Sequence, residues 1–405
     1  MVSKEIEIIK GHRLDYQLYQ YLLQYFSDNE LQNLFDAIRR PPNRYYVRVN
    51  TMKTSPSDLV NILQEHSVVV YIDETLPEAL WFPVKGGPNR IPSARKYVLA
   101  DKRAAESVYM GANLYVPGVV RMDDDIKRGG DEVNVIAPDG EIVAFGTAEI
   151  NHDEVKNVKR GGVAVRTLVS VYEVPKIREL HEYAIGLFYD QSLPAQWVAH
   201  VLNPRPGDVI VDMNAAPGGK TSHVIQLSGG KAVVYAFDRS ENKIREMIES
   251  LSRLGMDGLY RVEARDTRFL DVDRPDLVNS VDRVLIDPPC TDMGVRPRLF
   301  DVKTMEIVKS TAEYQRQFIK VAWKLLKPGG GVLVYSTCTI PPLENEDNIA
   351  YAESLGFEIV SINIPNASGG LIDRYRDSVV RFYPHVHGTP GFFIAKLIKP
   401  VQMHQ

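Results

Sequence analysis

Cys290 and Cys338 are the only cysteines in this chain of 405 residues, and each follows a predicted strand. The first closes the run Val-Leu-Ile-Asp-Pro-Pro-Cys, and the second comes directly after Val-Leu-Val-Tyr-Ser-Thr. Open parallel α/β sheets bind their ligands beyond the carboxyl ends of the strands. Two thiols brought to that edge suggest a nucleophile and a helper.

Other interpretations of the two thiols stay open at this point. Free cysteine is among the most buried residue types and often only packs. A disulfide or half of a zinc site is weakly indicated, because neither cysteine belongs to a CxxC pair or has a histidine at ligand spacing. His385 and His387 are too sparse a set for zinc, so no metal site is expected.

A loop of small residues lies upstream of both cysteines. A β-branched, apolar run ends at Asp212, residues 214–220 follow, and a helix is expected from about Thr221. Most residues of the loop carry almost no side chain, so a ligand can approach the backbone closely. The spacing matches neither the Walker P-loop nor the dinucleotide fingerprint.

Aspartates end the next three predicted strands of this region, at Asp238, Asp266 and Asp287. An acidic residue at the end of the second strand of a nucleoside-binding α/β fold accepts hydrogen bonds from ribose hydroxyls. Taken singly, each aspartate could be a helix cap or a turn residue. Their succession after a small-residue loop favours a cofactor of the adenosine type.

Three motifs, in this order, resemble those of the Fmu/Sun-type RNA cytosine-5 methyltransferases. They are Asn-Ala-Ala-Pro-Gly-Gly-Lys-Thr at 214–221, Asp-Pro-Pro-Cys-Thr-Asp-Met-Gly at 287–294 and Tyr-Ser-Thr-Cys-Thr-Ile-Pro-Pro-Leu-Glu-Asn-Glu at 335–346. The chain departs from the family pattern at Asn214, where Cys is usual, and at Pro288, where Ala is frequent. The resemblance implies an α/β fold with a class I (Rossmann-like) methyltransferase core.

The resemblance also implies a role for each residue of the motifs. Cys338 would be the nucleophile that adds to carbon 6 of cytosine, and Cys290 would aid elimination and release. Asp287 would face the ring nitrogen and amino group, and Lys220 would face the ring. The implied cofactor is S-adenosylmethionine, and the residues implied to hold it are Asn214, Ala215, Ala216, Pro217, Gly218, Gly219, Lys220, Asp238, Asp266 and Asp287.

Three domains are expected: an RNA-binding α/β unit at 1–95, a PUA-like β-barrel at 96–175 and the methyltransferase domain at 176–405. In the first unit, leucines at helical spacing predict helix over 14–40, interrupted near 27–29. A strand at 45–50, a helix at 55–65 and a strand at 68–72 follow. The unit carries four arginines that form either a phosphate-contacting patch or a solvated edge, namely Arg39, Arg40, Arg44 and Arg48.

The stretch 97–175 has dense turns and short strands, including a hairpin over 129–146 with a Pro-Asp-Gly turn. It is similar to the PUA domain, an RNA-binding module, although a purely structural insert is the alternative. The stretch holds more acidic than basic residues. Its basic side chains cluster at Lys102-Arg103 and at Lys156, Lys159, Arg160 and Arg166.

Composition and charge indicate how the protein can contact nucleic acid and in which compartment it is expected. The net charge is −4, so contacts with nucleic acid must come from local patches rather than from bulk charge. The start of the chain lacks the apolar core of a signal peptide, and no run is long enough to span a membrane. Two cysteines without a disulfide framework suit the cytoplasm. No obligate protein partner is evident.

Sun-type members with a PUA insert act on cytosine 72 of tRNA, so the resemblance implies tRNA as the partner, bound at its acceptor stem and 3′ end. Three alternatives remain open. One is an rRNA cytosine-5 methyltransferase, and another is a non-catalytic RNA-binding or assembly factor that retains the fold. The third, an amino-group methyltransferase, is disfavoured because Cys290 stands where such enzymes usually carry an aromatic residue.

Overall fold

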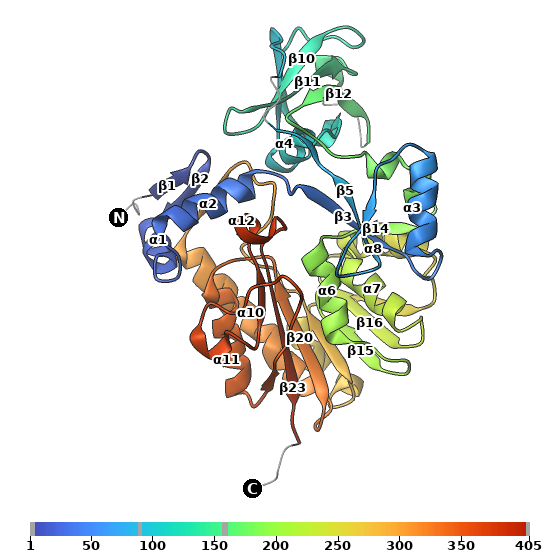
Figure 1. Cartoon of the computed structure of the whole chain (residues 1–405), viewed down its shortest axis with the longest axis vertical. Helices are drawn as coiled ribbons and strands as arrows, with labels where there is room; N and C mark the ends of the chain where they lie inside the picture. Colours follow the sequence, from blue (N-terminus) through green and yellow to red (C-terminus); the bar gives the residue numbers. More distant parts are fainter. Residues whose placement is uncertain (1–4, 88–90, 156–160, 402–405) are drawn as a thin grey trace.

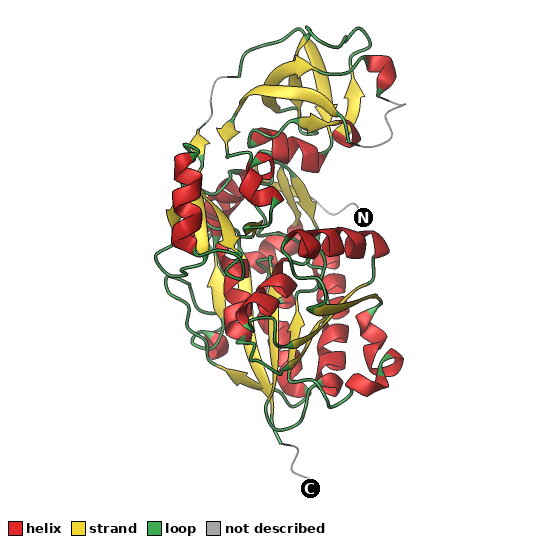
Figure 2. Cartoon of the chain, turned by 90° about the vertical axis from the view of Figure 1, so that its right-hand side faces the viewer, coloured by secondary structure: helices red, strands yellow, loops and turns green. Residues whose placement is uncertain are grey.

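The computed structural model describes residues 5–87, 91–155 and 161–401. The PUA region lies at one end of the long axis and the methyltransferase core at the other, with the N-terminal elements between and beside them (Figures 1 and 2). None of the helices in these ranges is long and apolar enough to cross a membrane.

The core is built on one eight-stranded sheet. Its order is β17-β16-β15-β18-β20-β23-β21, with β22 also paired to β23. The pairs among β15, β16, β17, β18 and β20 are parallel, whereas β23 runs antiparallel to its neighbours. The strands are β15 (Val209–Asp212), β16 (Val233–Asp238), β17 (Tyr260–Ala264), β18 (Arg283–Ile286), β20 (Gly331–Thr337), β21 (Glu358–Val360), β22 (Val380–Phe382) and β23 (Phe392–Lys399).

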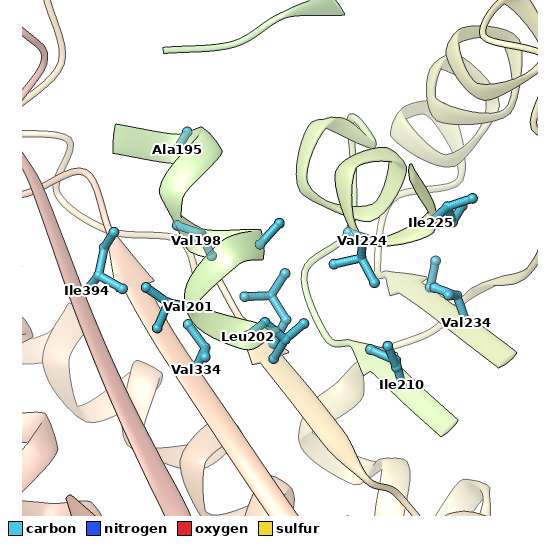
Figure 3. Close-up of a cluster of buried hydrophobic side chains, with 14 of the residues drawn as sticks. Ala195, Val198, Val201, Leu202, Ile210, Val224, Ile225, Val234, Val334 and Ile394 are labelled. Carbon is cyan, nitrogen blue, oxygen red and sulfur yellow. The ribbon is translucent and has the colours of Figure 1, made fainter. Parts of the chain in front are cut away.

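Helices cover both faces of this sheet, because successive residues of each strand point to opposite sides. Ile210, Val234 and Ile394 pack against α6 (Leu193–Leu202), α7 (Gly219–Leu227) and α8 (Glu241–Arg253), in the cluster drawn in part in Figure 3. Val211 and Leu333 face the other way, toward α10 (Met305–Leu325) and α11 (Glu346–Ser354). Shorter helices are α5 (His181–Ala184), α9 (Leu270–Asp273) and α12 (Pro384–His387).

Two small sheets on the N-terminal side borrow strands from distant parts of the chain. The hairpin β1 (Glu5–Ile9) and β2 (His12–Asp15) is joined by β19 (Asp301–Lys303). The second sheet has the order β14-β3-β5-β4, and β14 (Phe188–Asp190) comes from the segment expected to belong to the core. Its other strands are β3 (Arg44–Val49), β4 (Tyr71–Ile72) and β5 (Ala79–Pro83).

The N-terminal helices follow the predicted pattern with one difference. A single long helix is broken as expected, because Ser27 caps α2 (Asp28–Arg39) by accepting a hydrogen bond from Glu30 N. α1 (Tyr16–Leu22) starts later than predicted, since Leu14 belongs to β2 and Asp15 caps the helix. α3 (Pro56–Glu65) has Ser55 as its cap, close to the predicted start.

The PUA region folds around one six-stranded sheet of order β8-β12-β11-β10-β7-β9. The predicted hairpin is present as the antiparallel pair of β10 and β11. The chain segments before and after this sheet pair with each other, as the antiparallel strands β6 (Lys85–Gly86) and β13 (Tyr172–Glu173). The main elements are β7 (Lys96–Ala100), α4 (Lys102–Tyr109), β8 (Leu114–Tyr115), β9 (Val119–Met122), β10 (Glu132–Ile136), β11 (Ile142–Ala148) and β12 (Val163–Ser170).

Candidate active site

The two thiols meet at the carboxyl edge of the core sheet. Cys338 follows β20 directly, and Cys290 lies four residues beyond β18. Their sulfur atoms are 3.3 Å apart, and each lies 3.3 Å from Oδ1 of Asp292. Both cysteines are half-buried, so they remain reachable from the solvent.

A buried carboxylate fixes the two cysteine loops to one another. Glu344 is fully buried and accepts hydrogen bonds from Thr291 N at 2.9 Å and Gln315 Nε2 at 3.0 Å. It also accepts from the hydroxyls of Thr291 and Thr339, which lie 2.7 Å from each other. Because Thr291 adjoins Cys290 and Thr339 adjoins Cys338, this network sets the spacing of the two thiols.

Burial and neighbouring carboxylates keep both thiols protonated at neutral pH. The hydrogen bond with Cys338 and burial raise the pKa of Cys290 well above its usual range. The hydrogen bond with Cys290 lowers the pKa of Cys338, but burial and the carboxylates of Asp292 and Asp287 outweigh it and raise the pKa overall. Thiolate is the nucleophilic form, so one thiol must lose its proton before it reacts.

An ion pair stands beside the thiols. Lys220 Nζ, in the first turn of α7, lies 2.5 Å from Oδ2 of Asp287, and Ser336 Oγ donates to Oδ1 at 3.2 Å. Burial alone would lower the pKa of Lys220, but Asp287 raises it overall, with a smaller contribution from Cys338. The lysine therefore carries a positive charge close to Cys338.

The small-residue loop turns from β15 into α7 at a single strained position. Gly218 caps the helix with a φ of +99°, in the left-handed region that favours glycine. Ala215 N donates to Phe237 O at 2.8 Å, which ties the loop to the end of β16. Asp212 at the end of β15 accepts from Thr221 Oγ1 at 2.7 Å, and burial raises the pKa of Asp212 to about 6.

A cavity of about 310 Å³ opens between this loop and the cysteine edge. Six of the residues predicted to form the site line it: Asn214, Ala216, Asp238, Asp266, Asp287 and Cys290. Ala215, Pro217, Gly218, Gly219, Lys220 and Cys338 lie outside its lining and border it through the loop, the ion pair and the second thiol. The sequence therefore identified one contiguous site.

Three details of the cavity bear on the cofactor that it can hold. Asn214 Oδ1 is buried and lacks a hydrogen-bond partner, so it can accept from a ligand with an amino group. Asp238 accepts from Ser240 N at 3.0 Å in the turn after β16. Asp266 is paired with Arg268 at 2.6 Å, which lowers the pKa of its carboxyl. These acceptor positions fit S-adenosylmethionine, with Asn214 and Asp238 as acceptors for its amino and hydroxyl groups.

Sequence reasoning missed several residues of the site. Asp292 and Glu344 lie two residues after Cys290 and six after Cys338, so their closeness to the thiols in the sequence was a usable signal. Tyr314 and Phe318 of α10 also line the cavity, and nothing in the sequence connects that helix with it.

Only two of the four arginines considered for a surface patch have their charged groups at the surface. Arg48 is fully buried and donates to Gly219 O and Ser222 Oγ of α7, both at 2.7 Å. Arg39 is bound to Leu299 O and to the carboxylates of Asp139 and Glu141 of the PUA region. Both interpretations, a phosphate-contacting patch and a solvated edge, are therefore wrong for these two arginines, because their charged groups are bound inside the protein. Arg44, with Glu74 at 2.9 Å, and Arg40, with Asp36, are paired at the surface.

Comparison with known proteins agrees with this geometry. The family described as 16S rRNA methyltransferase RsmB/F matches residues 199–398, and the PUA domain matches residues 96–169. The chain is 41% identical over 390 residues to the tRNA (cytosine(72)-C(5))-methyltransferase of Pyrococcus horikoshii, covering 95% of this chain and 96% of that protein. It is 31% identical over 358 residues to the human tRNA (cytosine(72)-C(5))-methyltransferase NSUN6, covering 80% and 75%.

A solved structure extends the match to the whole fold. The crystal structure of NSun6 from Pyrococcus horikoshii with SFG, an S-adenosylmethionine analogue, is 40% identical with a TM-score of 0.85, covering 95% of this chain and 98% of that one. Fold and site thus define an S-adenosylmethionine-dependent class I methyltransferase. The chain belongs to the RsmB/F methyltransferase family and carries a PUA domain, as the sequence motifs indicated.

Proposed function

We propose that this protein methylates carbon 5 of cytosine 72 in tRNA, through a covalent bond between Cys338 and the base. The observation that carries the proposal is the pair of thiols 3.3 Å apart beside the ion pair of Lys220 and Asp287. The position in tRNA follows the names of the two relatives, which the chain matches over most of its length.

Cys338 is the better nucleophile of the two. The positive charge of Lys220 stabilises its thiolate, and the hydrogen bond between the two thiols lowers the pKa of Cys338 while it raises that of Cys290. When the sulfur of Cys338 bonds to carbon 6, the ring electrons move toward nitrogen 3 and carbon 5. The carboxylate of Asp287, whose charge acts on the Cys338 thiol, can take the proton that this thiol loses and pass it to nitrogen 3, which balances that charge.

S-adenosylmethionine, when bound, supplies an electrophilic methyl group to carbon 5. Cys290 lines the cofactor cavity, so its sulfur lies on the side where carbon 5 must lose its proton. A base takes that proton, and the electrons of the broken C–H bond restore the double bond between carbons 5 and 6. The bond from carbon 6 to Cys338 breaks with its electrons remaining on the sulfur, which leaves as thiolate, and nitrogen 3 returns its proton to Asp287. Cys290 acts in this second half, because its sulfur is within reach of the same ring.

The PUA domain supports docking of the 3′ end of the tRNA. A cleft of about 450 Å³ lies where α4 and β8 face the linker that returns to the core. Its exposed cations are Arg103, Lys176 and Arg178, and Tyr115 offers a half-exposed ring for stacking. Of the basic residues that cluster in the sequence, Arg103 lines this cleft. Arg166 is paired with Glu149 at 2.7 Å and Lys102 with Asp301 at 3.1 Å, and 156–160 lie outside the described residues.

Denaturing electrophoresis with labelled tRNA and S-adenosylmethionine tests the chemistry. We expect Cys338→Ala to abolish methylation, and Cys290→Ala to leave a covalent protein–RNA adduct that survives denaturation. Bisulfite sequencing of the product should place the methyl at cytosine 72. Turnover by Cys338→Ala, or an adduct with the two roles exchanged, contradicts the assignment. Preference for ribosomal RNA in the same assay would establish the alternative substrate.

Trimmed substrates test the docking of the 3′ end. Transfer RNA without its unpaired 3′ nucleotides should bind more weakly and be methylated more slowly, whereas cofactor affinity should not change. Equal methylation of trimmed and intact tRNA would exclude an end-reading role for the PUA domain and leave it a structural insert.

A further inference from the structure

A second cluster of titratable side chains lies away from the thiols, at the junction between the N-terminal sheet and the core. Glu78 stands directly before β5, His200 lies on α6 and His223 lies on α7. The two helices are neighbours beneath the strands β3 and β5 (Figure 1). The proposed reaction uses none of these three side chains.

The three side chains converge on a single point. His223 Nε2 lies 3.2 Å from Oε1 of Glu78, and His200 Nε2 contacts the same oxygen. One ligand atom from each residue falls within 4.8 Å of the other two. Ligands about 2.0–2.2 Å from a tetrahedral Zn²⁺ stand roughly 3.3 Å from one another. Only small side-chain movements separate the cluster from a metal site.

The polar groups of the cluster are arranged around one carboxylate oxygen. Both imidazoles direct Nε2 toward Oε1 of Glu78, so two ring nitrogens and one carboxylate face the same point. The nearby cation Arg48 directs its hydrogen bonds to Gln191, Gly219 and Ser222, which leaves Glu78 to the two histidines.

Unpartnered polar atoms show that side-chain hydrogen bonds alone do not satisfy this region. His223 is fully buried, and its Nδ1 lacks a partner, as do both amide atoms of Gln226 one turn further along α7. Buried polar groups are usually paired with protein or ordered water. His200 is 30% exposed, which provides a path of entry.

We propose that Glu78, His200 and His223 form a binding site for one divalent transition-metal ion, with Zn²⁺ as the favoured ion. Two imidazoles and one carboxylate are a ligand set that zinc accepts, with water in the fourth position. The ion would join the N-terminal sheet to α6 and α7. Since α7 also carries Lys220 three residues before His223, the metal would steady the helix that presents the catalytic ion pair.

Metal titration of the full-length, untagged protein tests the proposal. The two active-site thiols could bind zinc themselves, because Cys290, Asp292 and Cys338 also bring three ligand atoms together. The titration is therefore made in a Cys290→Ser, Cys338→Ser background after dialysis against a chelator. Calorimetry with ZnCl₂ should show one site per chain, and zinc should raise the midpoint of thermal unfolding.

Substitution of His200 identifies the site. His200→Gln, at a partly exposed position, should fold and weaken zinc binding at least tenfold. His66→Gln is the matched control, because His66 is an exposed histidine that pairs with Glu182 elsewhere in the N-terminal unit. Glu78→Gln, which keeps the shape of the side chain but removes its charge, should behave as His200→Gln does.

Two results would overturn the metal site. The first is the absence of stoichiometric zinc binding in the background variant. The second is zinc binding that His200→Gln and Glu78→Gln leave unchanged. In either case the three residues form a hydrogen-bonded structural triad, and the substitutions lower stability equally with and without zinc. Both results leave the proposed methylation untouched, since no assay of activity enters this test.

Discussion

The cysteine edge and the PUA cleft use charge in opposite ways. At the edge, Glu344 is fully buried and Lys220 is 16% exposed, and each is held by hydrogen bonds or an ion pair inside the protein. In the cleft, Arg103 and Arg178 are exposed. Bond formation needs atoms at fixed positions, whereas attraction to phosphate acts over several ångströms and tolerates moving side chains. The cysteine edge therefore holds its charged groups at fixed positions, whereas the cleft leaves its charged groups free to move toward phosphate.

The largest effect is expected from breaking the network that spaces the thiols. Glu344→Ala leaves Thr291, Thr339 and Gln315 without their buried acceptor, so the free energy of unfolding should fall by about 3–5 kcal/mol. Methylation should be lost in whatever protein still folds. Urea denaturation measures the first quantity. Glu313→Ala, an exposed glutamate on α10, is the control and should change stability by less than about 0.5 kcal/mol. Equal stabilities for the two variants would mean that the hydrogen bonds of Glu344 do not hold the two cysteine loops in place.

A smaller effect is expected at the cofactor end of the same region. Asp238→Ala should weaken S-adenosylmethionine binding by about 1–3 kcal/mol, the range for a hydrogen bond that involves a charged group. Calorimetry measures the affinity, and binding of tRNA should not change. Glu241→Ala, at an exposed position in the first turn of α8, is the control. Unchanged cofactor affinity in Asp238→Ala would remove this residue from the ribose role.

The pH dependence of the first turnover tests whether nearby carboxylates control the reactivity of Cys338. The raised pKa of Cys338 makes thiolate scarce at pH 7, so the single-turnover rate should rise with pH by up to about tenfold per unit until that pKa is reached. Asp292→Asn removes a carboxylate that raises the pKa, so its profile should move to lower pH. Asp257→Asn, at an exposed turn after α8, should leave the profile in place. An unshifted Asp292→Asn profile would show that this carboxylate does not control the thiol.

The smallest effect is expected in the cleft. Arg178→Ala should weaken tRNA binding a few-fold and reduce the slope of log affinity against log salt by about 1, because one fewer phosphate is neutralised. Arg121→Ala, an exposed arginine on β9 outside the cleft, should leave the slope unchanged. If both variants lose the same slope, the attraction comes from the whole PUA surface and not from this cleft.

The sequence predicted the core well because its signals are local. Apolar β-branched runs that end in Asp212 and Asp238 give strands wherever they are packed, and the observed β15 and β16 end at these two aspartates. The thiols, the loop and the aspartates were likewise found from the ends of these runs. Their roles rest on the resemblance to the family, since spacing alone cannot say which thiol attacks.

What the sequence did not predict depends on partners far along the chain. The leucine spacing extends a helix back to Leu14, but pairing of β2 with β19 turns that residue into strand. Residues 176–405 were expected to form the methyltransferase domain, yet Phe188–Asp190 pairs with β3 of the N-terminal sheet. Glu78 and His200 are separated by 122 residues, so no short motif could bring them together. Arg48 was placed on a surface because its buried acceptors lie on α7.

The borrowed strands have a consequence for the order in which the protein acquires its structure during synthesis. β3 lacks its β14 neighbour until residue 190 has emerged from the ribosome, and β2 lacks β19 until residue 303 has emerged. Every strand of the six-stranded PUA sheet, by contrast, lies within residues 96–170. The PUA domain is therefore the first part that can fold to completion, although it is encoded second. β2, although it is among the first parts to be translated, has no β19 partner until nearly three quarters of the chain has been made.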